Sequence, residues 1–445
     1  MTFTGPIATA GAAHPTARTR LHVETRGVVD PGELLPLADA TSPLAWLREG
    51  EGIVGIGEAL RLEFGGASRF ADAADAWRAI ADLAEVADAV DVPGSGLVAF
   101  ASFAFADDSA SPSALVVPAI VAGRRGGRAW ITRIRPIDGG TGSLPPLPHP
   151  TAFGAPWRVK LRDGALPPAE YEAAVADAVR RIEGGEFEKV VLARELRGRM
   201  PRGADVRRLA SKLSTDYPDT WTFAVDGLVG ASPETLVRVD RGGVSARVLA
   251  GTASRGVGAD GDHDAELRLA TSTKDRDEHA FAVRSAIETL RPHTSRLEAS
   301  AEPFTVRLPN LWHLATDLDG TLGDGSTSLD LVAAMHPTAA VAGSPTDVAT
   351  AAIAELEGFD RGRYAGPVGW IGADGDGEWA IALRCAQIGA DGTVRAHAGA
   401  GIVRDSDPGE ELAESTIKFQ AIVDAIAHDY ALTWDDVLEQ ATEGA

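Results

Sequence analysis

The feature that most constrains the fold lies near the C-terminus, in the segment AGAGIVRDSDPGEELAESTIK from Ala398 to Lys418. Its first part is an apolar run containing Gly399 and Gly401, which predicts a strand with little side-chain bulk at two positions. Short polar residues followed by Pro408 then predict the capped start of a helix. A strand that leads directly into a helix N-terminus places free backbone N–H groups at one point, which suits an anionic ligand.

The predicted helix carries Glu411, Glu414 and Lys418 at spacings of three and four, so all three share one face. Two carboxylates, an ammonium and free N–H groups would then meet in one small volume, as a site for a cation and an anion requires. The segment is also compatible with a structural interpretation. Acidic residues in a first turn offset the helix dipole, and Glu414–Lys418 can be an ordinary i,i+4 pair.

Composition excludes several classes of protein. The 445 residues carry a formal net charge of −22 and are 44% hydrophobic, which disfavours nucleic acid or an anionic membrane as a partner. The single cysteine, Cys385, allows no intrachain disulfide and no cysteine-based zinc site. We see neither a signal-peptide pattern nor an apolar run of about 18 residues. We therefore expect a cytoplasmic protein without a membrane segment.

The chain divides by composition. Residues 1–20 are expected to be a flexible N-terminus, 21–155 an N-terminal part with few chemical motifs, and 156–435 the part that carries the motifs. The segment 138–156 is rich in Gly and Pro and is the clearest linker.

Periodicity predicts elements along the whole chain. It indicates a helix over 70–90, one strand in ALVVPAIVAG over 114–123, and a three-stranded meander over 362–403. Further helices are predicted over 167–183, 205–213, 274–290, 346–356 and 408–428. Because the strands come largely in hairpin-connected runs with helices between them, we favour an α+β, mostly antiparallel architecture.

A second acidic pair lies in STKDRDEHAF, where Asp275 and Glu278 are three residues apart on one helix. With Glu411 and Glu414 it provides four carboxylates from two helices. Oxygen ligands of this kind suit Mg²⁺, which retains several waters and bridges to anionic substrates. The alternative for this helix alone is an ordinary solvated face.

Two residues are candidates for acid–base chemistry. Lys189 precedes the apolar run VVLAR, where it is either an ammonium at the strand edge or a buried neutral amine that acts as a base. Glu234, in GASPETL, follows a strand and a proline. It is either a turn cap or a carboxylic acid that an apolar site keeps protonated, so that it can donate a proton.

Other polar residues are weaker candidates. Gly251 and Thr252 form a turn with free N–H groups and a hydroxyl, or simply a loop. Arg384, on an otherwise apolar strand, is expected to have a carboxylate partner. His336 ends an apolar run and is either a core residue or part of a site. The chain lacks GxSxG, P-loop, HExxH and CxxC motifs, which argues against serine hydrolases, P-loop NTPases and zincins.

These segments, in their order and spacing, resemble the chorismate-utilising enzymes. The family includes isochorismate synthases, salicylate synthases, and the large chains of anthranilate and aminodeoxychorismate synthases. The resemblance covers roughly 155–430 and rests on KVVLAR, ASPE, LAGTASRG, KDRDEH, HPT, YAGPVGW and AGAGIV…SDPxxExxES…K. It implies two large antiparallel sheets packed together with helices outside. It also implies that the linker is an internal loop of one structural unit.

The resemblance also implies roles for residues. The catalytic pair is Lys189 and Glu234. The Mg²⁺ ligands are Glu278 and Glu414, supported by Asp275 and Glu411. The residues that bind the substrate, chorismate, are Gly251, Thr252, His336, Arg384, Gly399, Gly401 and Lys418.

Within the family, the chain is most similar to isochorismate synthase. Ammonia-using members typically have glutamine or another non-basic residue at the position of Lys189, and HPTAAVAG with YAGPVGW differs from the salicylate synthase segments. Ala339, where the family usually has proline, and Ser415, in place of threonine, are mild departures. The expected reaction is attack of water on ring C2 of chorismate, with loss of the C4 hydroxyl.

Three alternatives stay open at this point. A salicylate synthase would follow the same first step with loss of pyruvate. An aminating subunit would need a glutaminase partner, and a silent protein would only bind chorismate. The resemblance to isochorismate synthase implies a monomer without an obligate partner. The sequence does not decide whether the product serves menaquinone, a siderophore or salicylate.

Overall fold

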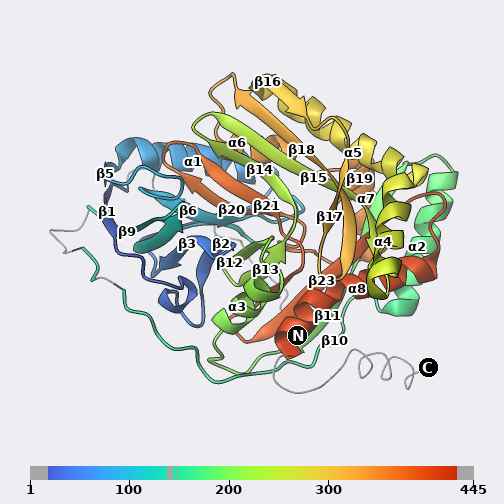
Figure 1. Cartoon of the computed structure of the whole chain (residues 1–445), viewed down its shortest axis with the longest axis horizontal. Coiled ribbons are helices and arrows are strands. Elements are labelled where there is room, and N and C mark those ends of the chain that lie inside the picture. Colours follow the sequence, from blue (N-terminus) through green and yellow to red (C-terminus); the bar gives the residue numbers. More distant parts are fainter. Residues whose placement is uncertain (1–18, 138–143, 147, 428–445) are drawn as a thin grey trace, which may run out of the picture.

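Two large β-sheets pack together, and helices lie outside them (Figure 1). The computed structural model describes residues 19–137, 144–146 and 148–427. The first sheet has 13 strands in the order β10-β11-β23-β22-β13-β12-β2-β3-β8-β9-β1-β5, with β19 beside β11. The second has 10 strands in the order β16-β18-β15-β14-β21-β20-β6-β7-β4, with β17 beside β18. In the described residues only β1 and β5 pair in parallel, so the expected α+β, mostly antiparallel architecture is confirmed.

The elements have the following bounds. The helices are α1 (Arg69–Leu83), α2 (Pro168–Glu183), α3 (Arg207–Asp216), α4 (Gly258–Thr271), α5 (Thr273–Leu290), α6 (Ser328–Met335), α7 (Thr346–Glu357) and α8 (Pro408–Ala427). The strands of the first sheet are β1 (Leu21–Val28), β2 (Leu44–Arg48), β3 (Glu51–Ile56), β5 (Glu85–Asp88), β8 (Ile120–Arg125), β9 (Arg128–Pro136), β10 (Arg162–Asp163), β11 (Lys189–Arg199), β12 (Trp221–Val225), β13 (Leu228–Ser232), β19 (Gly343–Ser344), β22 (Cys385–Ile388) and β23 (Thr393–Ile402). Those of the second are β4 (Leu60–Phe64), β6 (Val98–Ser102), β7 (Ser113–Val117), β14 (Thr235–Asp240), β15 (Gly243–Ser254), β16 (Thr294–Ala299), β17 (Phe304–Arg307), β18 (Leu311–Leu322), β20 (Pro367–Gly372) and β21 (Gly377–Ile381).

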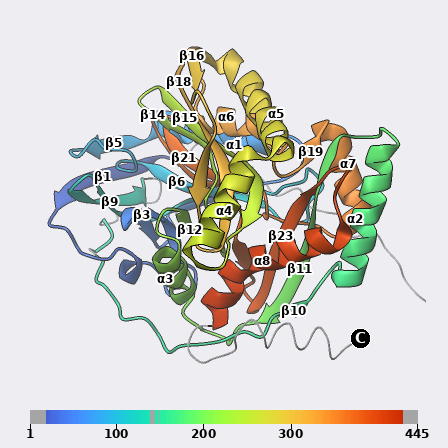
Figure 2. The same cartoon turned by 45° about the vertical axis from the view of Figure 1, so that its right-hand side comes forward.

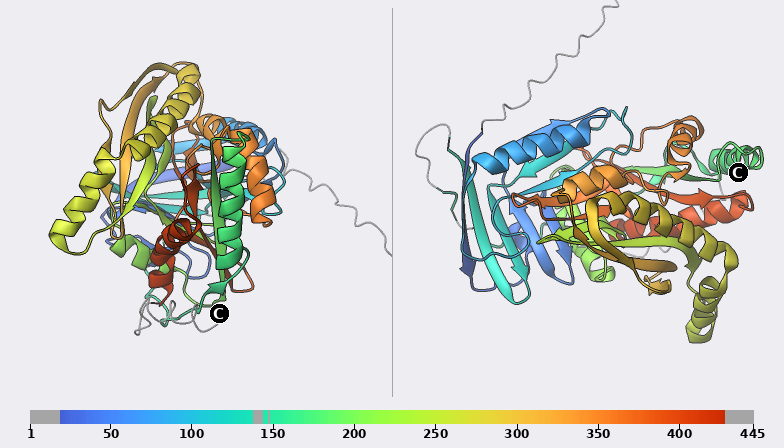
Figure 3. Two further views of the ribbon diagram at one scale, coloured as in Figure 1. Left: turned by 90° about the vertical axis from the view of Figure 1, so that its right-hand side faces the viewer. Right: turned by 90° about the horizontal axis from the view of Figure 1, so that it is seen from above.

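Several helices gather at one end of the molecule. Figure 3 shows α2, α7 and α8 grouped there, and α8 packs on β23 while α7 packs on β11. The N-terminal half of α5 faces the same region from the second sheet (Figure 2). This end therefore brings together the segments that carry the predicted motifs. Within the described residues, no helix has the length and apolar character needed to cross a membrane.

Three predicted elements differ from those observed, each for a physical reason. The helix expected over 70–90 ends at Leu83, because residues 85–88 pair with β1 as an edge strand. The strand expected over 114–123 is two strands in different sheets. They separate around Pro118, which lacks the N–H that a continuous ladder needs.

The expected meander over 362–403 also divides between the sheets. β20 and β21 belong to the second sheet, and β22 and β23 to the first. The chain crosses between them just before Cys385, where Arg384 has a φ of 48°. This backbone conformation is uncommon for a residue with a side chain, and such strain concentrates at functional sites.

A buried glutamate links the two sheets. Glu378 of β21 accepts hydrogen bonds from the indole N–H groups of Trp46 in β2, at 3.0 Å, and of Trp370 in β20, at 3.2 Å. Arg125 of β8 pairs with the same carboxylate at 2.8 Å. The charge is thus compensated in the core between the sheets.

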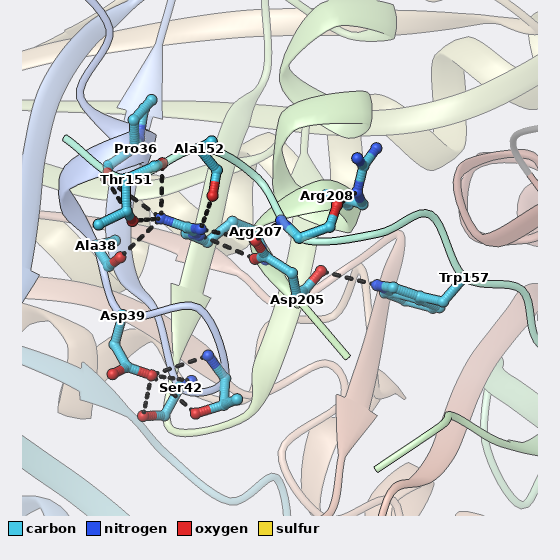
Figure 4. A network of polar contacts seen from close by, with 12 residues as sticks. Pro36, Ala38, Asp39, Ser42, Thr151, Ala152, Trp157, Asp205, Arg207 and Arg208 are labelled. Atoms are coloured by element: carbon cyan, nitrogen blue, oxygen red, sulfur yellow. Dashed lines mark hydrogen bonds and ion pairs between the residues drawn. The ribbon is translucent and has the colours of Figure 1, made fainter. Parts of the chain in front are cut away.

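The C-terminal part of the 138–156 linker is held by one arginine (Figure 4). The Arg207 guanidinium, with its side chain 2% exposed, pairs with Asp205 at 2.7 Å. It also donates to Thr151 Oγ1 at 2.7 Å and to the carbonyl oxygens of Ala152 and Ala38 at 3.1 and 3.2 Å. One side chain therefore connects α3, the C-terminal part of the linker, and the N-terminal part.

Residues 1–18, 138–143, 147 and 428–435 of the expected segments lie outside the described residues. Within the described part, each sheet contains strands from both 21–155 and 156–435, which pair at β12–β2 in the first sheet and at β20–β6 in the second. We infer from this sharing that the two parts fold as one unit, in which 138–156 is an internal loop.

We expect Arg207→Leu to destabilise the protein by about 3 kcal/mol or more, because it leaves Asp205 buried without its cation. Chemical denaturation, followed by tryptophan fluorescence and circular dichroism, should give one coincident transition that shifts as a whole. Arg202→Leu, at an exposed arginine nearby, is the matched control. Two separate transitions, only one of which moves, would contradict the single unit.

Candidate active site

One cavity of about 320 Å³ lies at the end of the molecule where the two sheets, α5 and α8 meet. Both sheets and both helices contribute to its wall. The predicted site residues that line it are Lys189, Glu234, Gly251, Thr252, Asp275, Glu278, Arg384, Gly399, Gly401, Glu411, Glu414 and Lys418. Residues far apart in the sequence are thus brought to one pocket, with His336 the exception.

Lys189 is the first residue of β11, and its side chain is only 11% exposed. Its ammonium contacts the Glu278 carboxylate. On the neighbouring strand, a Cβ at Gly401 would lie 2.9 Å from Lys189 Cε and 3.3 Å from Nζ. The missing side chain of Gly401 is therefore what allows the lysine to cross β23 and reach the pocket.

Glu234 lies between β13 and β14, directly after Pro233, and is 6% exposed. Its backbone is fixed because Ile381 N–H donates to its carbonyl oxygen at 3.2 Å. Burial raises the pKa of its carboxyl to about 8, against the opposing effect of Arg384, Lys189 and Lys418. At neutral pH the side chain is thus a carboxylic acid that can donate a proton.

Arg384 occupies the crossing between the sheets. The expected carboxylate partner is wrong: among the described residues no carboxylate pairs with it, and Nη2 instead lies 3.3 Å from His313 Nε2. A guanidinium only donates, so His313 accepts through Nε2 and carries its proton on Nδ1, 3.0 Å from Thr252 Oγ1. Burial, with Arg384 and Lys418, lowers the pKa of His313 to about 3, so the ring is neutral. Arg384 keeps its charge available for an anion in the pocket.

A β-bulge at Gly251 in β15 allows the first turn of α5 to approach the pocket. Gly251 has a φ of 79°, and the pairing of β15 with β18 shifts at this position. A Cβ there would lie 3.2 Å from Asp275 Cβ. Ser272 caps the helix by accepting the Asp275 N–H at 3.2 Å. The glycine and the cap together bring Asp275 and Glu278 against the strand.

The face of α8 carries the second acidic pair. Asp407 caps this helix, since its Oδ1 accepts the N–H groups of Gly409 and Glu410 at 2.9 and 3.0 Å. Lys418 donates to Glu414 at 2.6 Å and to the Gly399 carbonyl oxygen at 2.9 Å.

Glu411 lies one turn before Glu414 and accepts from Ser406 at 2.7 Å. Burial raises its pKa to about 7, and the nearby negative charge of Glu414 adds to this effect. At this part of the pocket wall, burial and the negative charge of Glu414 therefore both disfavour ionisation of Glu411.

The four carboxylates suit a hard cation in donor type and in number. In the described residues, however, no three Asp, Glu, His or Cys side chains converge closely enough to hold a metal ion. Glu278 and Glu414 are instead paired with Lys189 and Lys418. To hold a metal ion, each glutamate would have to give up the contact with its lysine.

His336 is the one predicted site residue outside this pocket, so its expected role in substrate binding needs correction. Its Nε2 lies 2.9 Å from the Phe105 carbonyl oxygen, and its ring packs against Phe70 and Phe105. Burial lowers the pKa of His336 to about 4. It is a neutral side chain held by the core.

The sequence interpretation missed several polar residues of the pocket. Lys274 precedes Asp275 in the same helical turn, a position that its neighbours could have indicated. His313 lies on an apolar segment without a motif, and Tyr364 begins YAGPVGW, a motif for which the sequence interpretation named no site residue. Only the folded sheets bring them to Arg384.

Comparison with known proteins agrees with this geometry. The family model described as "Chorismate binding enzyme" matches residues 154–427. The chain belongs to the chorismate-binding enzyme family. A Mycobacterium tuberculosis member, provisionally named isochorismate synthase MenF, is 37% identical over 72% of this chain and 84% of its own length. Isochorismate synthase DhbC of Bacillus subtilis is 37% identical over 59% of this chain and 69% of its own.

The fold is that of known family members. The structure of MenF, the menaquinone-specific isochorismate synthase from Escherichia coli, superposes with a TM-score of 0.73. The match covers 92% of this chain and 95% of that one, at 23% identity. The architecture of two sheets is therefore shared at a low level of sequence similarity.

We expect the Glu234 carboxyl to be protonated at pH 7 and to ionise near pH 8. The infrared difference spectrum between the wild type and Glu234→Gln should contain a protonated-carboxyl band that disappears across this pH. The unfolded value is near 4.5, so the unfolded state releases this proton first, and wild-type stability should fall between pH 4.5 and 8. Glu234→Gln should lack this part of the decline. An ionised carboxylate at pH 7 would contradict the assignment.

Proposed function

We propose that this chain is an isochorismate synthase, which isomerises chorismate to isochorismate as a cytoplasmic monomer without a glutaminase partner. The observation that carries the proposal is that Lys189 and Glu234, a lysine amine and a carboxylic acid protonated at pH 7, line one pocket with Arg384, which pairs with no carboxylate among the described residues. Relatives bearing this name, at 37% identity, support it.

In the proposed reaction the two catalytic residues act on different carbons of the ring. Lys189 takes a proton from a water molecule, which attacks ring C2. The double bonds shift, and the C4 hydroxyl leaves as water with the proton of Glu234. The mechanism requires a neutral Lys189 and a protonated Glu234 at the start of the reaction. Different surroundings can shift the pKa values of two such groups apart, so that one acts as the base and the other as the acid.

The other residues bind and orient the substrate. Arg384 and Lys418 would hold its carboxylates, with the N–H groups of Gly399 and Gly401 and the Thr252 hydroxyl. Arg384 is suited to this because no protein carboxylate competes for it in the described residues. Fixing the ring between the base and the acid provides much of the rate acceleration.

Glu278 and Glu414 would hold Mg²⁺, with Asp275 and Glu411 supporting them. The bound ion would supply positive charge that neutralises a substrate carboxylate. A cation bound by Glu278 would take the place of its present contact with the Lys189 ammonium.

The direct test is to incubate the purified protein with chorismate, with and without Mg²⁺, and to separate the products by chromatography. Isochorismate formed only with Mg²⁺ is expected. Salicylate with pyruvate would indicate a salicylate synthase instead. Binding of chorismate without any product would contradict the roles of Lys189 and Glu234.

We expect Lys189→Ala and Glu234→Gln each to lower kcat by about 100- to 10,000-fold, the usual contribution of a positioned acid or base. Thermal unfolding should show that both variants remain folded. Lys212→Ala, at a lysine outside this pocket, should keep full activity. A rate near that of the wild type in either catalytic variant would contradict the mechanism.

We expect Glu414→Gln to raise the Mg²⁺ concentration needed for half-maximal activity by roughly tenfold or more. Asp424→Asn, on the same helix but outside the pocket lining, is the control. An unchanged Mg²⁺ titration would remove Glu414 from the proposed ligands.

A further inference from the structure

A second cavity, of about 260 Å³, lies behind the proposed general acid. It is enclosed by α5, β14, β15 and the segment that follows α6, which lie together at the top of Figure 1. The residues of α5 that line it are Ala282, Ser285, Ala286 and Thr289. They follow, along the same helix, the residues Asp275 and Glu278 that line the first cavity. The same helix thus borders both cavities.

Glu234 and Ala340 line both cavities and form the wall between them. The Glu234 carboxyl receives no hydrogen bond from a protein group within the described part of the chain, although its backbone is held on both sides. A carboxyl without a protein partner, placed between two cavities, can exchange its proton with either.

The second cavity has polar groups suited to water. The Thr338 hydroxyl is buried and has no hydrogen-bond partner among the described residues. Ser285 contributes another hydroxyl on the opposite wall. A buried polar group without a protein partner is normally satisfied by water, and the cavity has room for several molecules.

The cavity also reaches the surface. Ala334 in its wall is exposed, and the Arg247 side chain is 31% exposed. Arg247 is held at 2.6 Å by Asp317, so it does not need the Glu234 carboxylate as a partner. A path from solvent to Glu234 therefore exists that avoids the substrate pocket.

The proposed reaction creates a need for such a path. Each turnover moves a proton from water to Lys189 and another from Glu234 to the leaving hydroxyl. Before the next turnover Lys189 must release the proton that it gained to solvent, and Glu234 must regain one. Reprotonation through the main pocket would have to wait for product release.

We propose that the second cavity is a proton-exchange chamber for Glu234. Water held by the Thr338 and Ser285 hydroxyls passes a proton from solvent to the Glu234 carboxylate after each turnover. The proton bound to a water oxygen moves to the carboxylate, and solvent replaces it. Thr338 and Ser285 are positioning residues, because they act through water. The proposal rests on the proposed isochorismate synthase reaction.

The charged groups around Glu234 make the proposed proton exchange measurable as a change in the pH dependence of the rate. On the pocket side it faces Lys189, Arg384 and Lys418, which favour its ionised form. On the cavity side lie Arg247, paired with Asp317, and His336, whose pKa is lowered to about 4 by burial, so that it stays neutral. Slower proton return should therefore be most visible at alkaline pH, where Glu234 is ionised.

The test fills the chamber with Ala286→Leu and compares it with Ala280→Leu, the same change on the same helix outside the linings of both cavities. Ala286→Leu should lower kcat by about tenfold, which corresponds to about 1.4 kcal/mol of barrier, and leave KM unchanged. It should increase the solvent deuterium isotope effect on kcat and move the alkaline limb of the pH profile to lower pH. Ala280→Leu should change none of these.

A second variant avoids the risk of overpacking. Thr338→Val keeps the shape of the side chain and leaves no hydrogen-bonding group of the described residues without its partner, so its melting temperature should not fall. It should lower kcat and raise the solvent isotope effect in the same direction, and Thr338→Ser should restore both.

The outcomes separate the two proposals. If the wild-type protein makes no isochorismate, the proposed function fails and the chamber has no role. If it does, an unchanged kcat and isotope effect in folded Ala286→Leu and Thr338→Val would overturn the chamber alone. A raised KM with unchanged kcat would also overturn it, because the cavity would then act on substrate binding.

Discussion

The site depends on the antiparallel ladder between β11 and β23. Its register places Val191 opposite Gly401 and Ala193 opposite Gly399. A Cβ at Gly399 would lie 2.1 Å from the Leu192 carbonyl oxygen, so the close approach of the strands requires glycine there. The buried Glu357–Arg361 pair holds the other edge of β11, since Glu357 accepts the Ala193 N–H at 2.7 Å and Arg361 donates to the Val191 carbonyl oxygen at 2.7 Å. A rigid ladder with bare glycines gives Lys189 its route into the pocket.

The pocket combines charges of both signs that are only partly satisfied within the protein. Lysines compensate Glu278 and Glu414, while Arg384 has a neutral histidine beside it and, among the described residues, no carboxylate partner. Glu234 avoids the cost of a buried charge by staying protonated, which is also the state that a general acid needs. Such an arrangement suits a site for a cation and an anionic ligand.

The sequence predicted the residues of the site more successfully than it predicted how the strands are arranged in the sheets. Spacing placed Glu411, Glu414 and Lys418 on one face of a helix, and all three line the pocket. It failed for His336, because an apolar run before a proline does not show whether the ring faces a pocket or a carbonyl oxygen. It also took residues 362–403 as one meander, since periodicity is the same whether consecutive strands stay in one sheet or change sheets.

The sequence by itself determined the class of fold, the identity of the helices that carry acidic pairs, and the residue types available for acid–base chemistry, because these follow from local periodicity, capping and spacing. The tertiary structure decided which residues meet. It set the protonated state of Glu234 by burial, placed Arg384 beside His313 at the crossing between the sheets, and placed a second cavity behind the acid. Burial and charge pairing are sums over neighbours that are distant in the chain, so no local pattern contains them.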